Sequence, residues 1–262
     1  MSTVAKTLAL LNLLSEQNPQ LGLTQFVQLS GYDKATTYRR LTELVNSGFL
    51  EQDPIDKNYR LGSGITRLAL VREATHPIRE IALRQLHKLN NELNETVHAS
   101  LLHGTQGLNT VAHVDDKNHG NRVYIDPAAI LPLHATASGL AVMAFASSQL
   151  KEALMAQALD NNAAIKGQDK ERVLAKIETA QRQGYAVTND TYEVGVTGIG
   201  VPFFNALGEV EGALACAMPT SRIGNEAEKA CALIKASCQL TQTLSGKLPT
   251  IITDLWSPYL QS

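Results

Sequence analysis

The segment from residue 23 to 61 limits what this 262-residue chain can fold into more than any other feature. Apolar residues at helical spacing predict a short first helix, and Gly31 after it can adopt the positive φ of a tight turn. A second helix is predicted from about residue 34 to 47. Two short strands, 49–51 and 59–61, then flank a turn-rich linker. This succession of elements is that of a winged helix-turn-helix.

Basic side chains gather on the second helix of this segment. Lys34, Arg39 and Arg40 are not offset by any acidic residue within its first two turns. Around them we expect a small, polar, exposed face, which suits a major groove about 12 Å wide. The hairpin that follows carries Lys57 and Arg60 and would be the wing. The pattern therefore predicts double-stranded DNA as a partner.

Each of these residues also has a simpler explanation. Lys34, Arg39 and Arg40 could form an ordinary solvated helix face, and Arg60 could anchor the hairpin. Tyr38 is spaced to pack against the domain core as well as to face DNA. A winged helix that binds protein instead of DNA is a third reading of the segment.

The composition of the whole chain narrows the class of protein. With 23 basic and 25 acidic residues the formal net charge is -2, which excludes nonspecific coating of nucleic acid as the main activity. The three cysteines, Cys216, Cys231 and Cys238, form no C-x-x-C pair and do not suggest a disulfide framework. Neither a signal pattern nor a run of about 20 apolar residues is present in the sequence. We therefore expect a cytoplasmic protein of two domains.

A helical pattern from residue 62 to 75 follows the wing and breaks near His76 and Pro77. We expect a DNA-binding domain over residues 1–61, a linker helix over 62–75 and a second domain over 76–262. The apolar residues of the linker helix could be ordinary core or the seam of a dimer. A dimer is favoured, because a helix that joins two domains has no other core to cover.

The second domain alternates strands and helices in mixed order, which predicts an α+β fold without internal repeats. The expected strands are 97–102, 108–114, 122–125, 185–188, 196–204 and 210–218. The expected helices are 138–146, 149–159, 170–183 and 226–245, and the last of these closes the fold.

Two sets of motifs give the chain a resemblance to a known family. The stretch LTQFVQLSGYDKATTYRRLTELVNSGFLEQ, followed by YRLGSGITRLA, resembles the DNA-binding domain of the IclR family of bacterial transcriptional regulators. Four further motifs resemble the effector-binding domain of the same family: LHATASG at 133–139, GYAV at 184–187, EVGV at 193–196 and VPF at 201–203. The motifs stand in the right order over nearly the whole chain.

The resemblance implies a winged helix-turn-helix joined by a linker helix to a GAF-like α+β effector-binding domain. It also implies a homodimer, often paired into a homotetramer, that binds a palindromic operator and responds to a small molecule. Many members control catabolic operons; no catalytic role and no cofactor are implied. Carried onto this chain, the DNA-binding positions are Thr24, Lys34, Ala35, Thr36, Thr37, Tyr38, Arg39, Arg40, Lys57 and Arg60. Two depart from the family pattern, since Ala35 replaces a serine or threonine and Arg40 replaces an apolar residue.

The resemblance also implies a set of effector-binding positions. They are Tyr124, His134, Ala137, Ser138, Thr188, Tyr192, Gly198, Ala215 and Ala217. Gly198 stands where a cysteine is frequent, and Ala215 and Ala217 stand where serines are common. Losing these small donors would make the pocket larger and drier. We therefore expect an effector that is bulkier or less anionic than a keto acid such as glyoxylate.

Histidines are frequent at the start of the second domain but do not predict a metal site. His98, His103, His113 and His119 lie at irregular spacing on separate predicted elements. Zinc needs convergent ligands, usually in close sequence pairs. We therefore expect no metal here.

One group of residues has the types needed for hydrolysis. Asp126, His134 and Ser138 could in principle form a triad, but the G-x-S-x-G elbow is missing from the sequence. Ser138 more simply caps a helix. An enzyme of sensor-domain fold, with the winged helix as a tether, is the alternative to a regulator.

Overall fold

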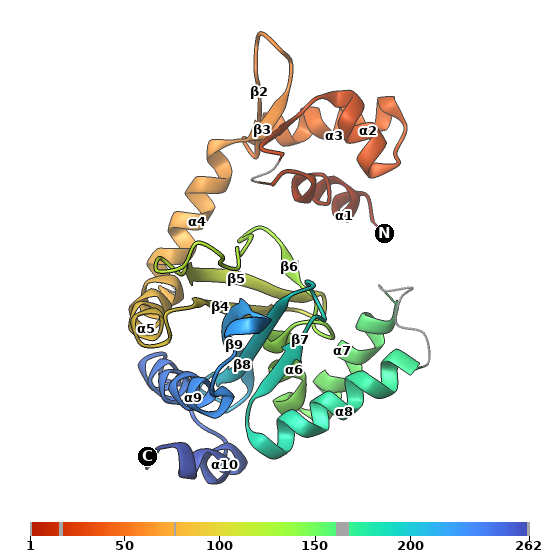
Figure 1. Ribbon diagram of the computed structural model, residues 1–262. Coiled ribbons are helices and arrows are strands. Elements are labelled where there is room, and N and C mark those ends of the chain that lie inside the picture. Colours follow the sequence, from red (N-terminus) through yellow and green to blue (C-terminus); the bar gives the residue numbers. More distant parts are fainter. Residues whose placement is uncertain (1, 16–17, 76, 161–167, 261–262) are drawn as a thin grey trace. The chain divides into compact units, whose positions relative to one another are not determined.

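The computed structural model describes residues 2–15, 18–75, 77–160 and 168–260. The chain divides into two compact units, Met1–Pro77 and Ile78–Ser262. Figure 1 draws the elements of both units. Within the described residues, no helix is long and apolar enough to cross a membrane.

The first unit is a small helical domain with a three-stranded antiparallel sheet. The strands follow the order β1-β3-β2, and Leu50 pairs with Leu61 across the hairpin. The elements are α1 (Thr3–Leu8), η1 (Leu11–Leu13), β1 (Gln20–Leu21), α2 (Leu23–Ser30), α3 (Lys34–Asn46), β2 (Leu50–Gln52), β3 (Tyr59–Leu61) and α4 (Ser63–Thr75). The expected winged helix-turn-helix is therefore present, and α2, α3 and the β2–β3 hairpin form it.

Local chemistry explains the helix-turn-helix within this unit. Gly31 ends α2 in the left-handed conformation, with φ of 69°, which costs glycine no steric clash. Asp33 then caps α3, because its Oδ1 accepts a hydrogen bond from the Thr36 amide at 2.8 Å. Beneath the two helices, the rings of Phe26 and Tyr59 meet edge to face with centroids 6.0 Å apart. The wing strand β3 is thus tied to α2 through the core.

Helix α4 presents apolar side chains that its own chain leaves uncovered. Leu68, Leu70 and Val71 are 45%, 66% and 55% exposed. Its start is fixed more firmly, since the Gly64 amide donates to the Gly48 carbonyl at 2.9 Å. The expected linker helix therefore exists, with an apolar surface open in the single chain.

The second unit is an α+β domain built on one antiparallel sheet, in the order β6-β5-β4-β9-β8-β7. Helices α5 and α9 pack together against one side of the sheet, and α6 packs against β8 and β9 (Figure 1). The elements are α5 (Ile78–Leu93), β4 (Thr96–His103), β5 (Gly107–Val114), β6 (Ile130–Leu131), α6 (Ala137–Phe145), α7 (Ser148–Asp160), α8 (Gln168–Gln183), β7 (Ala186–Asn189), β8 (Val196–Phe204), β9 (Val210–Pro219), η2 (Thr220–Arg222), α9 (Glu226–Thr243) and α10 (Thr250–Leu260).

Two features of this domain differ from the sequence prediction. Residues 122–125 were expected to be a strand, but they form an irregular loop, and β6 pairs with β5 in their place. The loop is held by its backbone, because the Thr96 hydroxyl donates to the Val123 carbonyl at 2.9 Å. The sequence also failed to predict α10, whose Trp256 is fully buried and donates from Nε1 to the Gly184 carbonyl at 2.8 Å.

Phe26 and Leu29 lie on the same helix and allow a matched test of the winged-helix core. Phe26 is 0% exposed and Leu29 is 58% exposed. Because Phe26→Ala opens a cavity beside Tyr59, it should destabilise the first unit by about 3–5 kcal/mol. Leu29→Ala should change its stability by less than about 0.5 kcal/mol. Hydrogen exchange of residues 23–61 in the full chain under urea measures both, and equal effects would contradict this packing.

Candidate functional site

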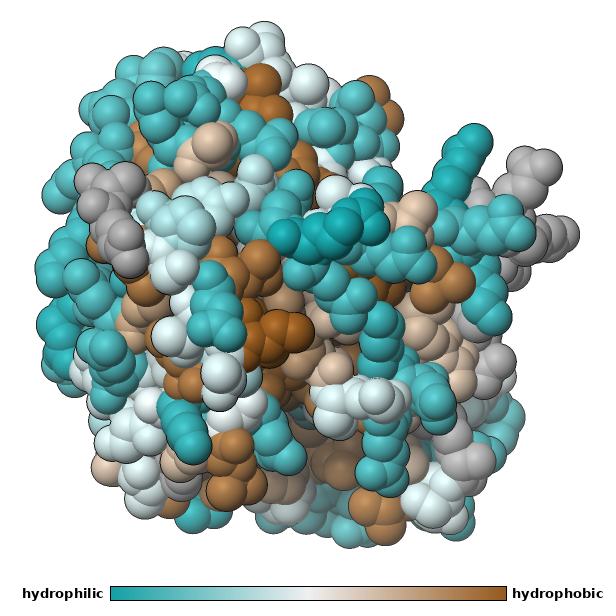
Figure 2. Space-filling view, turned by 90° about the horizontal axis from the view of Figure 1, so that it is seen from below, coloured by the Kyte–Doolittle hydropathy of each residue, from teal (hydrophilic) through white to brown (hydrophobic). Residues whose placement is uncertain are grey.

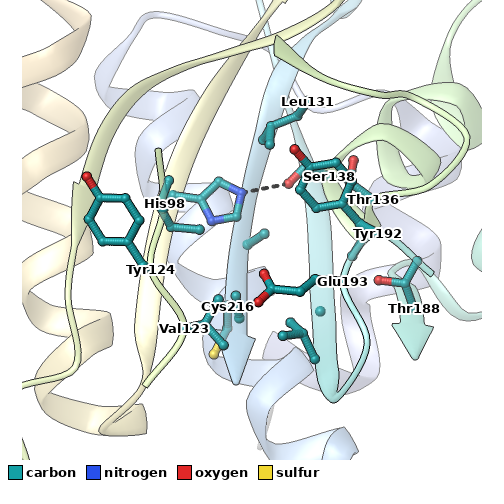
Figure 3. Close-up of a pocket in the computed structure, with 16 residues that line it drawn as sticks. His98, Val123, Tyr124, Leu131, Thr136, Ser138, Thr188, Tyr192, Glu193 and Cys216 are labelled. Atoms are coloured by element: carbon teal, nitrogen blue, oxygen red, sulfur yellow. Dashed lines mark hydrogen bonds between the residues drawn. The ribbon is translucent and has the colours of Figure 1, made fainter. Parts of the chain in front are cut away.

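A pocket lies between the sheet of the second unit and the start of α6. It spans about 550 Å³ of space free of atoms, including the part open to solvent. Figure 3 shows its polar side chains converging from β4, α6, β7 and two loops. The lining residues are His98, Val123, Tyr124, Ile125, Leu131, Thr136, Ala137, Ser138, Thr188, Tyr192, Glu193, Val196, Gly198, Ala215, Cys216 and Ala217.

Two buried side chains form the polar centre of this pocket. His98 Nε2 and Ser138 Oγ lie 3.0 Å apart and share a hydrogen bond (Figure 3). Burial, and to a smaller extent the nearby His113, lower the pKa of His98 to about 4. The imidazole is therefore neutral at physiological pH. Thr136, and not Ser138 as the sequence suggested, caps α6, because its Oγ1 accepts a hydrogen bond from the Gly139 amide at 3.1 Å. Ser138 is the second residue of that helix.

Small residues on β8 let α6 approach the sheet closely. A Cβ atom at Gly200 would lie 2.7 Å from the backbone of Ala137, closer than any side chain can sit. At Gly198 a Cβ atom would lie 3.1 Å from Thr188 Oγ1 and 3.2 Å from the Ala137 Cβ atom. These glycines place the start of α6 on the sheet, with Ser138 near His98.

The loop that carries Val123 and Tyr124 is anchored by a buried ionic network. Arg222 donates to Glu95 at 2.6 Å and to Asp116 at 3.1 Å, and it also bonds the Asn121 carbonyl. His119 Nδ1 lies 2.8 Å from Asp116 Oδ2. Burial acts to raise the pKa of Asp116, but hydrogen bonds from Asn118 and His119 outweigh it and hold that pKa below its usual range.

The same network contains three groups that could in principle ligate a cation. Ligand atoms of Glu95, Asp116 and His119 lie within 4.8 Å of one another. Arg222 already supplies the positive charge between the two carboxylates. The arrangement is thus explained as an ion pair. Of the four histidines considered from the sequence, His119 is the one in this cluster.

The structure places eight of the nine expected effector positions around the pocket. These are Tyr124, Ala137, Ser138, Thr188, Tyr192, Gly198, Ala215 and Ala217. His134 is absent from the described lining, and its own partial burial lowers its pKa. Sequence reasoning missed His98, Thr136, Glu193 and Cys216 as lining residues. The alternation of β4 places His98 on one face of the strand, but only the sheet register, in which it pairs with Ala215, brings it to the pocket.

The first turns of α3 form the candidate DNA-binding face. Lys34, Ala35, Tyr38 and Arg39 are exposed, and Thr36 is half-buried. The exposed set combines the small residue Ala35 with the basic residues Lys34 and Arg39. Thr24 on α2 is exposed as well. Side chains at these positions are free to meet a DNA groove or its phosphates.

Two of the expected groove positions are not on this face. The prediction that Arg40 is exposed is wrong, because Arg40 is only 8% exposed and its guanidinium carbon stacks 4.5 Å from the centre of the Tyr32 ring. Thr37 is fully buried, and its hydroxyl donates to the Asp33 carbonyl at 2.9 Å. Both lie on the helical stripe of Leu41, which faces the core.

The β2–β3 hairpin forms the candidate wing. Lys57 and Arg60 are both exposed. Arg60 lies 3.4 Å from Glu51 on the neighbouring strand, so the alternative that it anchors the hairpin has a structural basis. An exposed pair of this kind contributes only about 0–1 kcal/mol, and the guanidinium can exchange partners easily.

A second hollow differs from the first in chemistry. It lies between α10 and the turn from β8 to β9 and is lined mainly by apolar residues such as Phe145, Leu150, Phe204 and Ile252. Figure 2, which views the molecule from below, shows exposed hydrophobic residues among hydrophilic ones. No buried histidine or serine pair occurs in the part of its lining that the structure describes.

A winged helix joined to a domain with a buried polar pocket is the plan of a one-component transcriptional regulator. The family model of the IclR helix-turn-helix domain matches residues 3–54. That of the bacterial transcriptional regulator IclR C-terminal domain matches residues 73–242. The chain therefore belongs to the IclR family of bacterial transcriptional regulators.

Individual relatives agree with this assignment. The HTH-type transcriptional regulator XynR of Escherichia coli is 28% identical over 225 residues, which cover 84% of this chain and 87% of XynR. The glycerol operon regulatory protein of Streptomyces coelicolor is 28% identical over 94% of this chain and 96% of its own. A solved structure from Silicibacter sp. TM1040, described as an IclR transcriptional regulator, is 36% identical with a TM-score of 0.82, covering 95% of this chain and 99% of that one.

The ionic network can be tested by removing its one cation. Because Glu95 and Asp116 are buried, Arg222→Met should destabilise the protein by about 3–5 kcal/mol at pH 7. The control Arg84→Met breaks an exposed pair with Glu80 and should cost at most about 0.5 kcal/mol. Urea unfolding of the full chain gives both values.

The pH dependence of this effect has a defined sign. Asp116 has a lowered pKa in the folded state, so its contribution is present above its unfolded pKa and is lost as the pH falls. The stability gap between Arg222→Met and the unaltered protein should therefore persist above the ordinary carboxyl pKa of 3.8 and narrow as the pH falls below it. A gap that is constant or wider at low pH would contradict the network.

Proposed function

We propose that this protein is a ligand-responsive regulator that binds a palindromic operator as a homodimer or dimer of dimers in the cytoplasm. A small organic metabolite in the pocket would change its affinity for DNA and so control a catabolic operon. The observation that carries this proposal is the presence in one chain of an exposed basic helix, α3, and a pocket with a buried polar centre, His98 and Ser138. Binding of DNA by α3 would be coupled to binding of the metabolite in the pocket.

In this proposal the exposed face of α3 enters the major groove. Arg39 would fork onto a guanine or bridge a phosphate, and a bidentate base contact is worth about 1–3 kcal/mol of discrimination. Lys34 would neutralise a phosphate, and Lys57 and Arg60 on the wing would do the same. Arg40 would contribute indirectly, by holding Tyr32 in the turn between the two helices.

The exposed apolar surface of α4 supports a dimer. Leu68, Leu70 and Val71 would be covered by the same helix of a second copy. Such a dimer would place two α3 helices in major grooves about one helical turn apart, or a multiple of it. A palindromic operator would then match the two-fold axis of the protein.

The pocket supports a metabolite that is bulkier or less anionic than glyoxylate. Ala215, Ala217 and Gly198 form a wall without side-chain donors, as the sequence suggested. Thr188 Oγ1 lies against this wall, 3.1 Å from where a Cβ atom at Gly198 would be, and Ser138 lines the same pocket. A ligand that filled the pocket and left operator affinity, footprint and transcription unchanged would rule out the proposed coupling.

An enzyme is the second candidate function, and one observation favours it. The hydrogen-bonded pair of Ser138 and His98 resembles a nucleophile and its base. Two facts weigh against it: His98 Nδ1 has no partner among the described residues to orient the ring, and a pKa of about 4 makes the imidazole a weak base at neutral pH. Turnover of p-nitrophenyl acetate that is lost in Ser138→Ala would support the enzyme.

Arg39 provides the test of DNA binding. Arg39→Ala should weaken binding to a DNA site selected from a random library by about tenfold or more and reduce the salt dependence by about one phosphate contact. The thermal stability of the Arg39→Ala protein should equal that of the unaltered protein, because Arg39 is exposed. Fluorescence anisotropy over a range of salt concentrations measures both quantities.

A matched control is Lys88→Ala, which removes an exposed cation from α5 in the other unit. It should leave operator affinity unchanged. If Arg39→Ala binds as tightly as the control, α3 is not the recognition helix, and the reading of this domain as a protein-binding winged helix gains support.

A further inference from the structure

The charge of the pocket lining limits the ligands that the pocket can hold. Among the described lining residues there is no lysine and no arginine, and Glu193 contributes a carboxylate. The one basic side chain among them, His98, is buried and neutral. A ligand carboxylate would therefore lose its hydration without gaining a cationic partner, which is unfavourable.

The hydrogen bond between His98 and Ser138 defines what the pocket can recognise. If Nε2 carries the proton, it donates to Ser138 Oγ, and the serine hydroxyl is free to donate while Nδ1 can accept. If Nδ1 carries the proton, the serine donates to Nε2, Nδ1 can donate, and Ser138 Oγ can accept. In both tautomers, the pair keeps at least one donor and one acceptor that are not used in the bond between His98 and Ser138.

The structure leaves part of this capacity unused. His98 Nδ1 is buried and has no hydrogen-bond partner among the described residues. The ring itself is 6% exposed, so bulk water does not satisfy it. Buried polar groups in native proteins are normally paired, and an unpaired one beside a cavity indicates a missing partner.

We propose that the pocket recognises an uncharged, hydroxyl-bearing molecule, that Ser138 is the group that binds its hydroxyl, and that His98 is the residue that positions Ser138. A hydroxyl both donates and accepts, as the pair does, whereas a carboxylate only accepts. Val123, Ile125 and Val196 would pack against the apolar part of the molecule. This inference rests on the proposed function, because it assigns the ligand class of the same pocket.

One feature of the site favours the opposite ligand class. The first amides of α6 carry the partial positive charge of a helix N-terminus, which attracts anions. That charge is about half of one elementary unit, and the carboxylate of Glu193 in the lining opposes it. A carboxylate ligand is therefore the competing outcome of the test.

The test compares probes that differ in little but charge. Benzyl alcohol is matched with benzoate, and cyclohexylmethanol with cyclohexanecarboxylate, each titrated calorimetrically into the full-length protein at pH 7.5. Each alcohol should bind at least about tenfold more tightly than its acid. Ser138→Ala should weaken alcohol binding by about tenfold, the effect of one hydrogen bond, whereas the exposed control Ser148→Ala should have no effect.

His98 is tested by rescue. His98→Leu removes the support of Ser138 and should weaken alcohol binding about as much as Ser138→Ala does. His98→Gln can still bond the serine and should bind alcohols within about threefold of the unaltered protein. Thermal melts identify any variant that fails to fold, and Ser138→Ala, which removes a single oxygen, keeps the test valid without the His98 variants.

Every outcome bears on the inference. Acids that bind as tightly as the alcohols, or alcohol binding that survives Ser138→Ala, would overturn it and leave the pocket as an effector site of another class. Binding of neither probe type would also overturn it. The Arg39→Ala experiment on operator DNA is independent of these probes, so failure of the ligand class is distinguishable from failure of the regulatory function.

Discussion

The close approach of α6 to β8 is the constraint on which the pocket depends. Gly200 leaves no room for a side chain against the backbone of Ala137, and Gly139 is equally tight against Leu133. These contacts bring Ser138 within 3.0 Å of a histidine that is 40 residues earlier in the chain. A single larger residue at Gly200 would push the helix away and separate the pair. Backbone packing thus creates the polar centre of the site, because it determines where the side chains of Ser138 and His98 lie.

The second determinant is the loop that covers the pocket opposite α6. Its geometry depends on Arg222, which is more than a hundred residues away and bonds both Asp116 and the Asn121 carbonyl. A buried ionic network of this kind contributes little net stability compared with apolar packing, but it strongly penalises any arrangement that leaves a carboxylate unpaired. The network therefore selects one conformation of the loop and holds Val123 and Tyr124 against the pocket.

Sequence reasoning succeeded where a local period carried the information. The pattern of residues 23–61 was enough to predict the helix-turn-helix and its wing, because each element there follows from its own residues. Arg40 was misplaced because a charged residue was expected to be exposed, whereas a neighbouring ring, Tyr32, lets the guanidinium be buried. Residues 122–125 have the composition of a strand, but they form a loop tied to the sheet by the hydrogen bond from the Thr96 hydroxyl to the Val123 carbonyl. The short strand β6 pairs with Leu108 and Asn109 of β5. His98 was missed because its meaning depends on Ser138, a contact that no local pattern records.

In the regulatory function proposed above, α5, the element with which the second unit begins, carries the effect of a ligand toward the winged helix. The Asn90 side chain on α5 donates to the carbonyls of Glu95 and Asp115, at 2.9 and 3.1 Å, so this helix is tied to both ends of the pocket-covering network. A ligand can shift a protein between two states only by its difference in affinity for them. In the proposed coupling, the glycine and alanine positions of the sheet wall have no side-chain rotamers to exchange, whereas the loop residues Val123 and Tyr124 do. The proposed path for the effect of a ligand therefore runs from this loop through Asn90 to α5.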